Sequence, residues 1–300
     1  MTRRSAKASE AERLRGLVAA YDGYRQRGGE PARHLGLPSP FMTLIVTLDE
    51  PVHVIRHVDR ARPPARYDAL VGGLHASPVV IGHDGAQSGI QLRVSPLASR
   101  ALFGVPAAEL AGLDLPASDM LGGLANELHE RIAAASSWRE RFAILDRALT
   151  RRLTDTPEIA APVVQAWQLI LASAGSAPVA IIAREVGWSE RHLTKRFSRE
   201  VGLTPKLASR IVRFYRARRA LQSQQAAGGR PEIAWTAADC GYADQSHLVR
   251  DFRAFAELPP SRWLREEFGN VQDEPPSAVY CPAHEHQNTP TPGLANSSRP

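Results

Sequence analysis

Short apolar runs alternate with turns rich in Gly and Pro over the first 118 residues of the chain. Runs of this length predict β-strands, and several in succession favour a small sandwich or barrel. Residues 14–21 differ, because Leu14, Leu17, Val18 and Tyr21 follow helical spacing and predict an amphipathic helix. The predicted strands are residues 41–48, 52–58, 69–74, 78–82 and 90–94.

The pattern becomes helical after this segment. Residues 95–110 predict a turn into a short helix that closes the strand-rich region, and residues 121–174 carry three apolar stripes at helical spacing. Such stripes usually pack neighbouring helices together, and a dimer interface is the alternative interpretation. The stripes are Leu124, Leu128 and Ile132; Trp138, Phe142, Leu145 and Leu149; and Val163, Val164, Trp167, Ile170 and Leu171.

An apolar skeleton that occurs twice is the strongest pattern in the chain. Its offset is 55 residues, with one residue of slack at the glycine: Ala183, Gly187, Leu193, Phe197, Leu203 and Pro205 recur as Ala238, Gly241, Leu248, Phe252, Leu258 and Pro260. Each copy predicts a helix, a tight turn at Gly and a second helix, with Ser189 and Asp244 as N-caps of the second helices. Helix-turn-helix units have this form, and their second helix enters a DNA major groove.

One position departs from the repeat. Glu257 stands where the first copy has Gly202, which is a helix stop. A left-handed cap at a residue other than glycine costs on the order of 1 kcal/mol. A cap of another type is the alternative.

The outer faces of the two second helices differ although their buried skeleton repeats. The first carries Arg191, Thr194, Lys195 and Ser198, and the second carries Gln245, Ser246, His247, Val249 and Arg250. Because Gln pairs with adenine and Arg or Lys with guanine, these are side chains of the base-reading kind. Two copies with different readers predict two different half-turns of one asymmetric DNA site.

A helix is also expected between the two units, over residues 205–221. At 1.5 Å per residue it spans about 25 Å, which is enough to hold two recognition helices about one turn of DNA apart. Arginines surround its apolar stripe and are candidates for phosphate contacts: Arg210, Arg213, Arg216, Arg218 and Arg219.

Residues 176–268 resemble the DNA-binding domain of the AraC/XylS family of bacterial transcription regulators. The matching runs are Ile-Ala-x-x-x-Gly-Trp-Ser-x-x-x-Leu-x-x-x-Phe over residues 182–197 and Gly-Tyr-Ala-Asp-Gln-Ser-His-Leu-Val-Arg-Asp-Phe over residues 241–252. The resemblance implies double-stranded promoter or operator DNA as a partner, with RNA polymerase as a further candidate. It implies base contacts by Arg191, Thr194, Lys195, Gln245, Ser246, His247, Val249 and Arg250.

Four parts make up the α+β chain that these patterns and the resemblance predict. Residues 1–118 are an N-terminal β-rich domain. The resemblance to the family implies that this domain is a degenerate cupin-like barrel, which binds a small-molecule effector or forms a homodimer. Residues 119–175 are a helical connecting region, and residues 176–268 are the all-α DNA-binding domain. Residues 269–300 are rich in Pro, Ser, Asn and Thr and are expected to be disordered.

The charge distribution agrees with DNA as the partner. Residues 176–268 hold 16 Arg and Lys against 10 Asp and Glu, and the whole chain holds 37 against 31, so the net charge of +6 belongs to this segment. The two cysteines are too few for a disulfide framework. Without an apolar run near the ~20 residues of a membrane helix, or an apolar signal core, we expect a cytoplasmic protein with no membrane partner.

Catalytic and metal-binding chemistry find little support. His53, His57, His75 and His83 are the plausible metal set of the barrel, but His53 and His57 on one strand would lie about 13 Å apart. We therefore expect no metal, no cofactor and no enzymatic activity. A metal-binding or catalytic barrel fused to a DNA-binding module is the alternative, and Cys281, His284 and His286 form a second, weaker cluster. Sequence-indifferent DNA packaging fits badly with readers such as Gln245.

Overall fold

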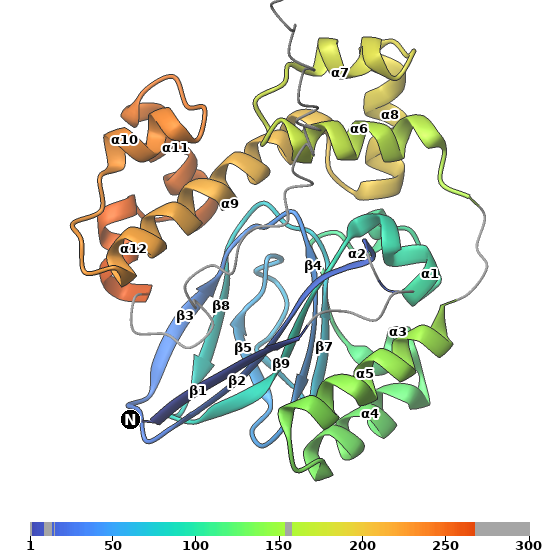
Figure 1. Cartoon of the computed structure of the whole chain (residues 1–300), viewed down its shortest axis with the longest axis vertical. Coiled ribbons are helices and arrows are strands. Elements are labelled where there is room, and N and C mark those ends of the chain that lie inside the picture. The colour runs from blue at the N-terminus through green and yellow to red at the C-terminus, as the bar shows by residue number, and fades with distance from the viewer. Residues whose placement is uncertain (1, 9–13, 15, 154–157, 268–300) are drawn as a thin grey trace, which may run out of the picture.

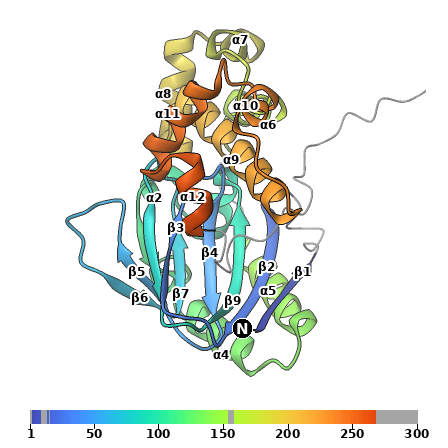
Figure 2. The same cartoon turned by 90° about the vertical axis from the view of Figure 1, so that its left-hand side faces the viewer.

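The computed structural model describes residues 2–8, 14, 16–153 and 158–267, and its first half is a β-sandwich (Figures 1 and 2). Every strand pair is antiparallel. The larger sheet has the order β1 (Thr2–Ala8), β2 (Val18–Arg27), β9 (Gln87–Val94), β4 (Met42–Thr47), β7 (Ala69–Gly72) and β10 (Asp114–Pro116). The smaller sheet has the order β3 (Ala32–Gly36), β8 (Val79–His83), β5 (Val52–Arg56) and β6 (Ala65–Tyr67).

Strand β4 of the larger sheet is buried on both faces because its apolar side chains are consecutive. On β4, Ile45 packs with Val54 and Ile81 of the smaller sheet. Its neighbours Leu44 and Val46 belong instead to the core that includes the helices. One strand therefore serves two hydrophobic cores, as its period of two residues requires.

The five predicted strands are confirmed as β4, β5, β7, β8 and β9, but the amphipathic helix over residues 14–21 is wrong. Val18 opens strand β2, and the register against β9 shifts between Val18 and Ala20. This irregularity leaves Val18 and Tyr21 both buried although they are three residues apart. A bulge in a strand can thus give buried apolar residues the three-residue spacing that is expected of a helix.

The connecting segment is helical, as predicted. Helices α4 and α5 form a hairpin that packs on β1, β4 and β7, and Trp138 of α5 lies so close to β2 that a Cβ on Gly23 would be 2.7 Å from its ring. The helices from the end of β9 to the end of this segment are η2 (Pro96–Ala98), α1 (Ser99–Phe103), α2 (Ala107–Leu110), α3 (Ala117–Leu121), α4 (Gly123–Ala134), α5 (Trp138–Arg152) and α6 (Ala161–Ala172).

The three helical stripes pack against other parts of the same chain. Leu128, Leu145 and Ile170, one from each stripe, are at most 1% exposed. The packing interpretation is therefore confirmed for these stripes, and their buried members are not available to a second copy.

The second half of the chain lies at one end of the sandwich (Figures 1 and 2). Helix α9 runs between two small lobes, which hold α7 and α8 on one side and α10 to α12 on the other. The bounds are α7 (Val179–Glu185), α8 (Glu190–Val201), α9 (Pro205–Ala226), α10 (Ile233–Asp239), α11 (Gln245–Ala256) and α12 (Pro260–Glu267). Among the described helices, none has the length and apolar character needed to cross a bilayer.

Candidate nucleic-acid interface

The same turn joins the two helices of each motif. Gly187 and Gly241 adopt left-handed backbones with φ of 73° and 74°. The following amide of Trp188 donates to the Ala183 carbonyl at 2.9 Å, and the amide of Tyr242 donates to Ala237 at 2.9 Å. Ala237 in the second motif is therefore the structural equivalent of Ala183 in the first.

The pairing of Ala183 with Ala238 in the sequence repeat is accordingly one residue off. Ala237 is 1% exposed, whereas Ala238 is on the surface. The offset is 54 residues up to Tyr242 and 55 residues from the N-cap onward, which locates the extra residue at Ala243.

Both predicted N-caps are confirmed. The Ser189 hydroxyl accepts from the His192 amide at 3.3 Å, and the Asp244 carboxylate accepts from the His247 amide at 2.6 Å. Each cap fixes the start of a 12-residue helix, α8 or α11. The two helices that could enter DNA thus begin in the same way.

The inner faces of α8 and α11 are anchored in aromatic cores. Phe197 and Phe252 are both fully buried. The ring of Phe197 lies 6.1 Å from that of Trp167, and the ring of Phe252 lies 4.9 Å from that of Phe214 on α9 and 5.4 Å from that of Trp263. This packing sets which face of each helix points outward.

The predicted base-reading residues all lie on the outward faces. Arg191, Lys195, Gln245, Ser246 and Arg250 are exposed, and the remaining three, Thr194, His247 and Val249, are partly exposed. Within the part of the chain that the structure describes, the side chains of Arg191, Lys195, Gln245 and Arg250 make no hydrogen bond or ion pair. Their donors and acceptors are free for a ligand.

A histidine on an aromatic ring recurs in both motifs, and sequence reasoning identified only one of the two. The rings of Trp188 and His192 meet edge to face at 4.6 Å, and those of Tyr242 and His247 at 5.0 Å. His192 was not among the predicted site residues. The 55-residue offset from His192 to His247 is the signal that could have found it.

Four arginines of α9 have partners within the protein, and phosphate contacts by this helix stay a prediction. Arg210 pairs with the buried Asp251 of α11 at 2.7 Å. The guanidinium of Arg213 lies over the Tyr242 ring at 5.5 Å, and those of Arg218 and Arg219 lie near the Tyr215 ring. Arg210 and Arg213 connect α9 to its surroundings, whereas Arg218 and Arg219 contact a ring of α9 itself.

The first motif is tied to the β domain at the end of α8. Arg100 of α1 donates two hydrogen bonds to Glu200, at 2.7 and 2.9 Å, and this contact raises the pKa of Arg100 above its usual range. On α9, the Tyr215 hydroxyl accepts from Arg93 at 2.9 Å, and Arg93 also pairs with Asp22. Both contacts hold the helical half on the sandwich.

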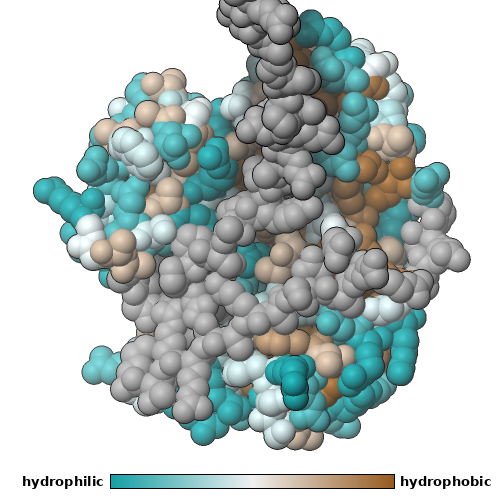
Figure 3. Space-filling view, viewed as in Figure 1, coloured by the Kyte–Doolittle hydropathy of each residue, from teal (hydrophilic) through white to brown (hydrophobic). Residues whose placement is uncertain are grey.

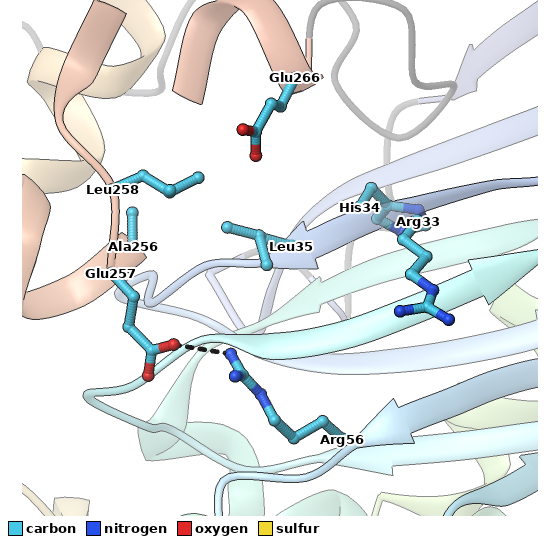
Figure 4. Close-up of a pocket in the computed structure, with 8 residues that line it drawn as sticks. All are labelled: Arg33, His34, Leu35, Arg56, Ala256, Glu257, Leu258 and Glu266. Atoms are coloured by element: carbon cyan, nitrogen blue, oxygen red, sulfur yellow. Dashed lines mark hydrogen bonds and ion pairs between the residues drawn. The ribbon is translucent and has the colours of Figure 1, made fainter. Parts of the chain in front are cut away.

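The second motif is tied to the β domain through Glu257, which follows α11. Its carboxylate pairs with Arg56 at 2.8 Å and with Arg60 at 2.5 Å. Figure 4 shows Glu257 facing Arg56 at the edge of a pocket of about 250 Å³ between β3 and α12. Its backbone is left-handed, with φ of 59°, so the predicted alternative cap is not used.

The histidines do not form a metal centre in the described residues. His57 is buried and bonds to Asp114 at 2.9 Å, and the His75 ring donates to the Ser77 carbonyl at 2.6 Å. His53 and His83 line a second cavity, of about 190 Å³, on β5 and β8. The residues around Cys281 lie outside the described part of the chain.

Cys240 behaves as a packed thiol. It is 2% exposed, and burial raises the pKa of its thiol to about 11. A thiol with so high a pKa is protonated at neutral pH and is a poor nucleophile.

A family model described as a helix-turn-helix domain matches residues 182–266. A comparison with curated proteins gives no match. The solved structures that resemble this chain include the apo form of a single-residue variant of ToxT from Vibrio cholerae, which is 11% identical, covers 82% of this chain and 97% of its own, and has a TM-score of 0.50. ToxT with a bound unsaturated fatty acid is 12% identical, covers 84% and 97%, and has a TM-score of 0.46.

The structure of the AraC-like transcriptional activator CuxR is also similar, at 14% identity over 70% of this chain and 93% of its own, with a TM-score of 0.23. At these identities the likeness to apo ToxT concerns the fold: an N-terminal β domain followed by helices. The family match covers both motifs whose turns, caps and outward faces are described above. The chain is a DNA-binding transcription regulator with a helix-turn-helix domain of the AraC type.

Proposed function

We propose that this regulator reads two successive major grooves of an asymmetric operator, one with α8 and one with α11. The observation that carries the proposal is the pair of outward faces that share a scaffold but not their side chains. Arg191, Thr194 and Lys195 occupy one face, and Gln245, Ser246, Val249 and Arg250 occupy the other. Two motifs with the same backbone arrangement but different outward side chains are suited to different base sequences.

The chemistry of these side chains suggests a role for each. Arg191, Lys195 and Arg250 are suited to the O6 and N7 acceptors of guanine, and Gln245 to the paired donor and acceptor of adenine. Val249 can contact a thymine methyl group. Ser246 and Thr194 are short hydroxyls that bond to either bases or phosphates.

Helix α9 acts in this proposal as a rigid spacer. It is 22 residues long, so it extends about 33 Å at 1.5 Å per residue. The pair of Arg210 with Asp251 fixes α11 on it. Because the separation of successive grooves on one face is about 34 Å, a spacer that cannot flex favours one operator spacing.

The β domain is proposed to bind a small polar effector in the cavity that residues of β5 and β8 line. The Gly85 amide donates to Nδ1 of His83, which leaves Nε2 as the donor of that ring. Nε2 of His83 and Nε2 of Gln87 are buried and have no acceptor among the described residues. Both residues line the cavity together with His53 and Arg66, so the lining favours a ligand with carboxylate or carbonyl oxygens.

Footprinting on promoter DNA with the purified protein tests the operator proposal. We expect protection of two adjacent major grooves on one face of the duplex. Arg191→Ala should relax selection at one or two base positions of one half, and Gln245→Ala should do so in the other, each costing about 1–3 kcal/mol on the operator. Equal losses on operator and random duplex would contradict base reading by these residues.

A further inference from the structure

Two large apolar side chains stand out on the surface of the described chain. Ile181 is 39% exposed and Trp235 is 56% exposed, and no other large hydrophobic residue described is comparably exposed. They occupy equivalent places, because each is the third residue of the first helix of its motif, α7 (Val179–Glu185) or α10 (Ile233–Asp239). The recurrence at the 54-residue offset sets them apart from singly scattered apolar residues, which are ordinary.

Neither side chain is among the buried core residues of its own motif. The buried positions of the first helices are the next two residues, Ile182 and Ala183 in α7 and Thr236 and Ala237 in α10. On the outer side, Ala180 and Ala234 are exposed as well. In the view of Figure 3 the lobe of α10 to α12 is largely hydrophilic.

We infer that Ile181 and Trp235 pack against the sugar-phosphate backbone of bound DNA, one at each half of the operator. The inference rests on the proposed function. The residues that differ between the motifs are suited to bases, which differ between half-sites. A surface feature that is the same in both motifs should meet what is the same at both half-sites, and that is the backbone.

The position of these residues within the motif supports this occupant. The first helix of a helix-turn-helix crosses the DNA backbone while the second lies in the groove. Helices α7 and α10 pack directly on α8 and α11, and the inference places their outer faces beside the proposed DNA surface. The apolar faces of deoxyribose are the groups that an isoleucine and an indole ring would cover.

Binding measurements separate this contact from base reading. Ile181→Ala and Trp235→Ala should each lose about five- to tenfold in affinity, because a partly exposed apolar side chain gains only part of its burial energy on binding. The loss should be equal on a duplex from the footprinted promoter and on a random duplex. The slope of log K against log salt should stay at the wild-type value, because an apolar contact releases no counterions.

Trp235→Phe is the matched control for the affinity measurement. It keeps an aromatic ring at the contact and should bind both duplexes within about twofold of wild type. Because Trp235 is exposed in the free protein, none of these variants should lose secondary structure, which circular dichroism checks. A Trp235→Ala protein that binds both duplexes as wild type does would overturn the inference.

Fluorescence gives a second readout that does not depend on affinity. The chain has 5 tryptophans, and Trp235 is the most exposed one described. Random duplex DNA should reduce acrylamide quenching of the wild type and of Trp138→Phe, whose substitution is in α5. The reduction should be smaller in Trp235→Phe, and a reduction of equal size there would contradict the contact.

The outcomes also separate this inference from the proposed function. A wild-type protein that binds random and promoter duplexes equally, or binds neither, would remove the proposed operator reading itself. Variants of Ile181 and Trp235 with unchanged DNA binding but reduced promoter activity in transcription assays would assign the two residues to a protein partner. That result overturns the inference and leaves operator reading intact.

Discussion

Glu257 and Gly202 occupy equivalent places after α11 and α8, and both have left-handed backbones, with φ of 59° and 84°. Glycine adopts this conformation freely, whereas glutamate carries a cost of about 1 kcal/mol. The Glu257 carboxylate meets Arg56 and Arg60 of the β domain. The second motif has therefore exchanged a relaxed cap for a contact between domains.

Substitutions at Glu257 should separate these two effects. Glu257→Ala loses both ion pairs and keeps the backbone cost, whereas Glu257→Gly loses the pairs but relieves that cost. We expect the glycine variant to be the more stable of the two by about 1 kcal/mol in urea unfolding. Equal stabilities would mean that the backbone cost at this position is negligible.

Asp251 should be essential for the docking of α11 on α9. It is 2% exposed and accepts from Arg210 at 2.7 Å. Asp251→Ala should lower the free energy of unfolding by about 2 kcal/mol, because it removes a charge-assisted bond from a buried site. The surface variant Asp239→Ala is the control and should change the free energy of unfolding by less than about 0.5 kcal/mol.

Arg213 distinguishes a packed arginine from one that binds phosphate. Its guanidinium lies over the Tyr242 ring, so Arg213→Ala should destabilise the domain by about 1 kcal/mol. The salt dependence of DNA binding should not change. A slope lower by about one unit would instead assign Arg213 to a phosphate, contrary to its place in the structure.

The two histidines on aromatic rings should act alike. The ring contacts of His192 and His247 are equivalent, and their backbone amides bind the two N-caps. By the same logic that applies to Ile181 and Trp235, a feature common to both motifs is suited to the DNA backbone. His192→Ala and His247→Ala should therefore weaken binding to promoter and random duplex equally, as measured by fluorescence anisotropy. A loss confined to the promoter duplex would show that the histidine reads a base.

The stability of the β domain should depend on Asp49 at acidic pH. Burial raises the pKa of Asp49, but a hydrogen bond from Ser88 and the charges of Arg25 and Arg27 outweigh it and hold the pKa below the ordinary 3.8. A depressed carboxyl pKa stabilises the fold above pH 3.8, and this stabilisation is lost as pH falls through the folded-state pKa.

Urea unfolding of Asp49→Asn and wild type at several pH values checks this dependence. The asparagine variant should be less stable near pH 7, and the difference should shrink on acidification below about pH 4. A difference that is constant with pH would attribute the effect to lost hydrogen bonds alone.

The helical half of the fold could be predicted from the sequence because local chemistry specifies it. The turn at Gly187, the cap at Ser189 and the spacing of Leu193 and Phe197 act within a few residues of each other. The buried positions also determine the opposite face of the helix, so the outward placement of Arg191 could be predicted from them. The exact alignment of Ala183 did not follow, because adjacent alanines in α10 look alike until their burial is known.

The β domain was less predictable because its strands depend on partners far along the chain. Strand β2 is bulged and half polar, and it pairs with β9, which comes much later in the sequence. The partners of the α9 arginines could not be predicted for the same reason. Only the fold brings Asp251 to Arg210 and Tyr242 to Arg213, so their net charge suggested a phosphate surface.

The glycine after α8 also determines how the first motif sits on the β domain. A Cβ at Gly202 would lie 2.9 Å from the Cα of Ala108 and 2.8 Å from the Cβ of Ala111. The first motif thus has a close steric fit beside its Arg100–Glu200 pair, whereas the second is held through partly exposed ion pairs at Glu257. Since salt screens charges and leaves van der Waals contact unaffected, rising ionic strength should loosen the second motif from the β domain more than the first.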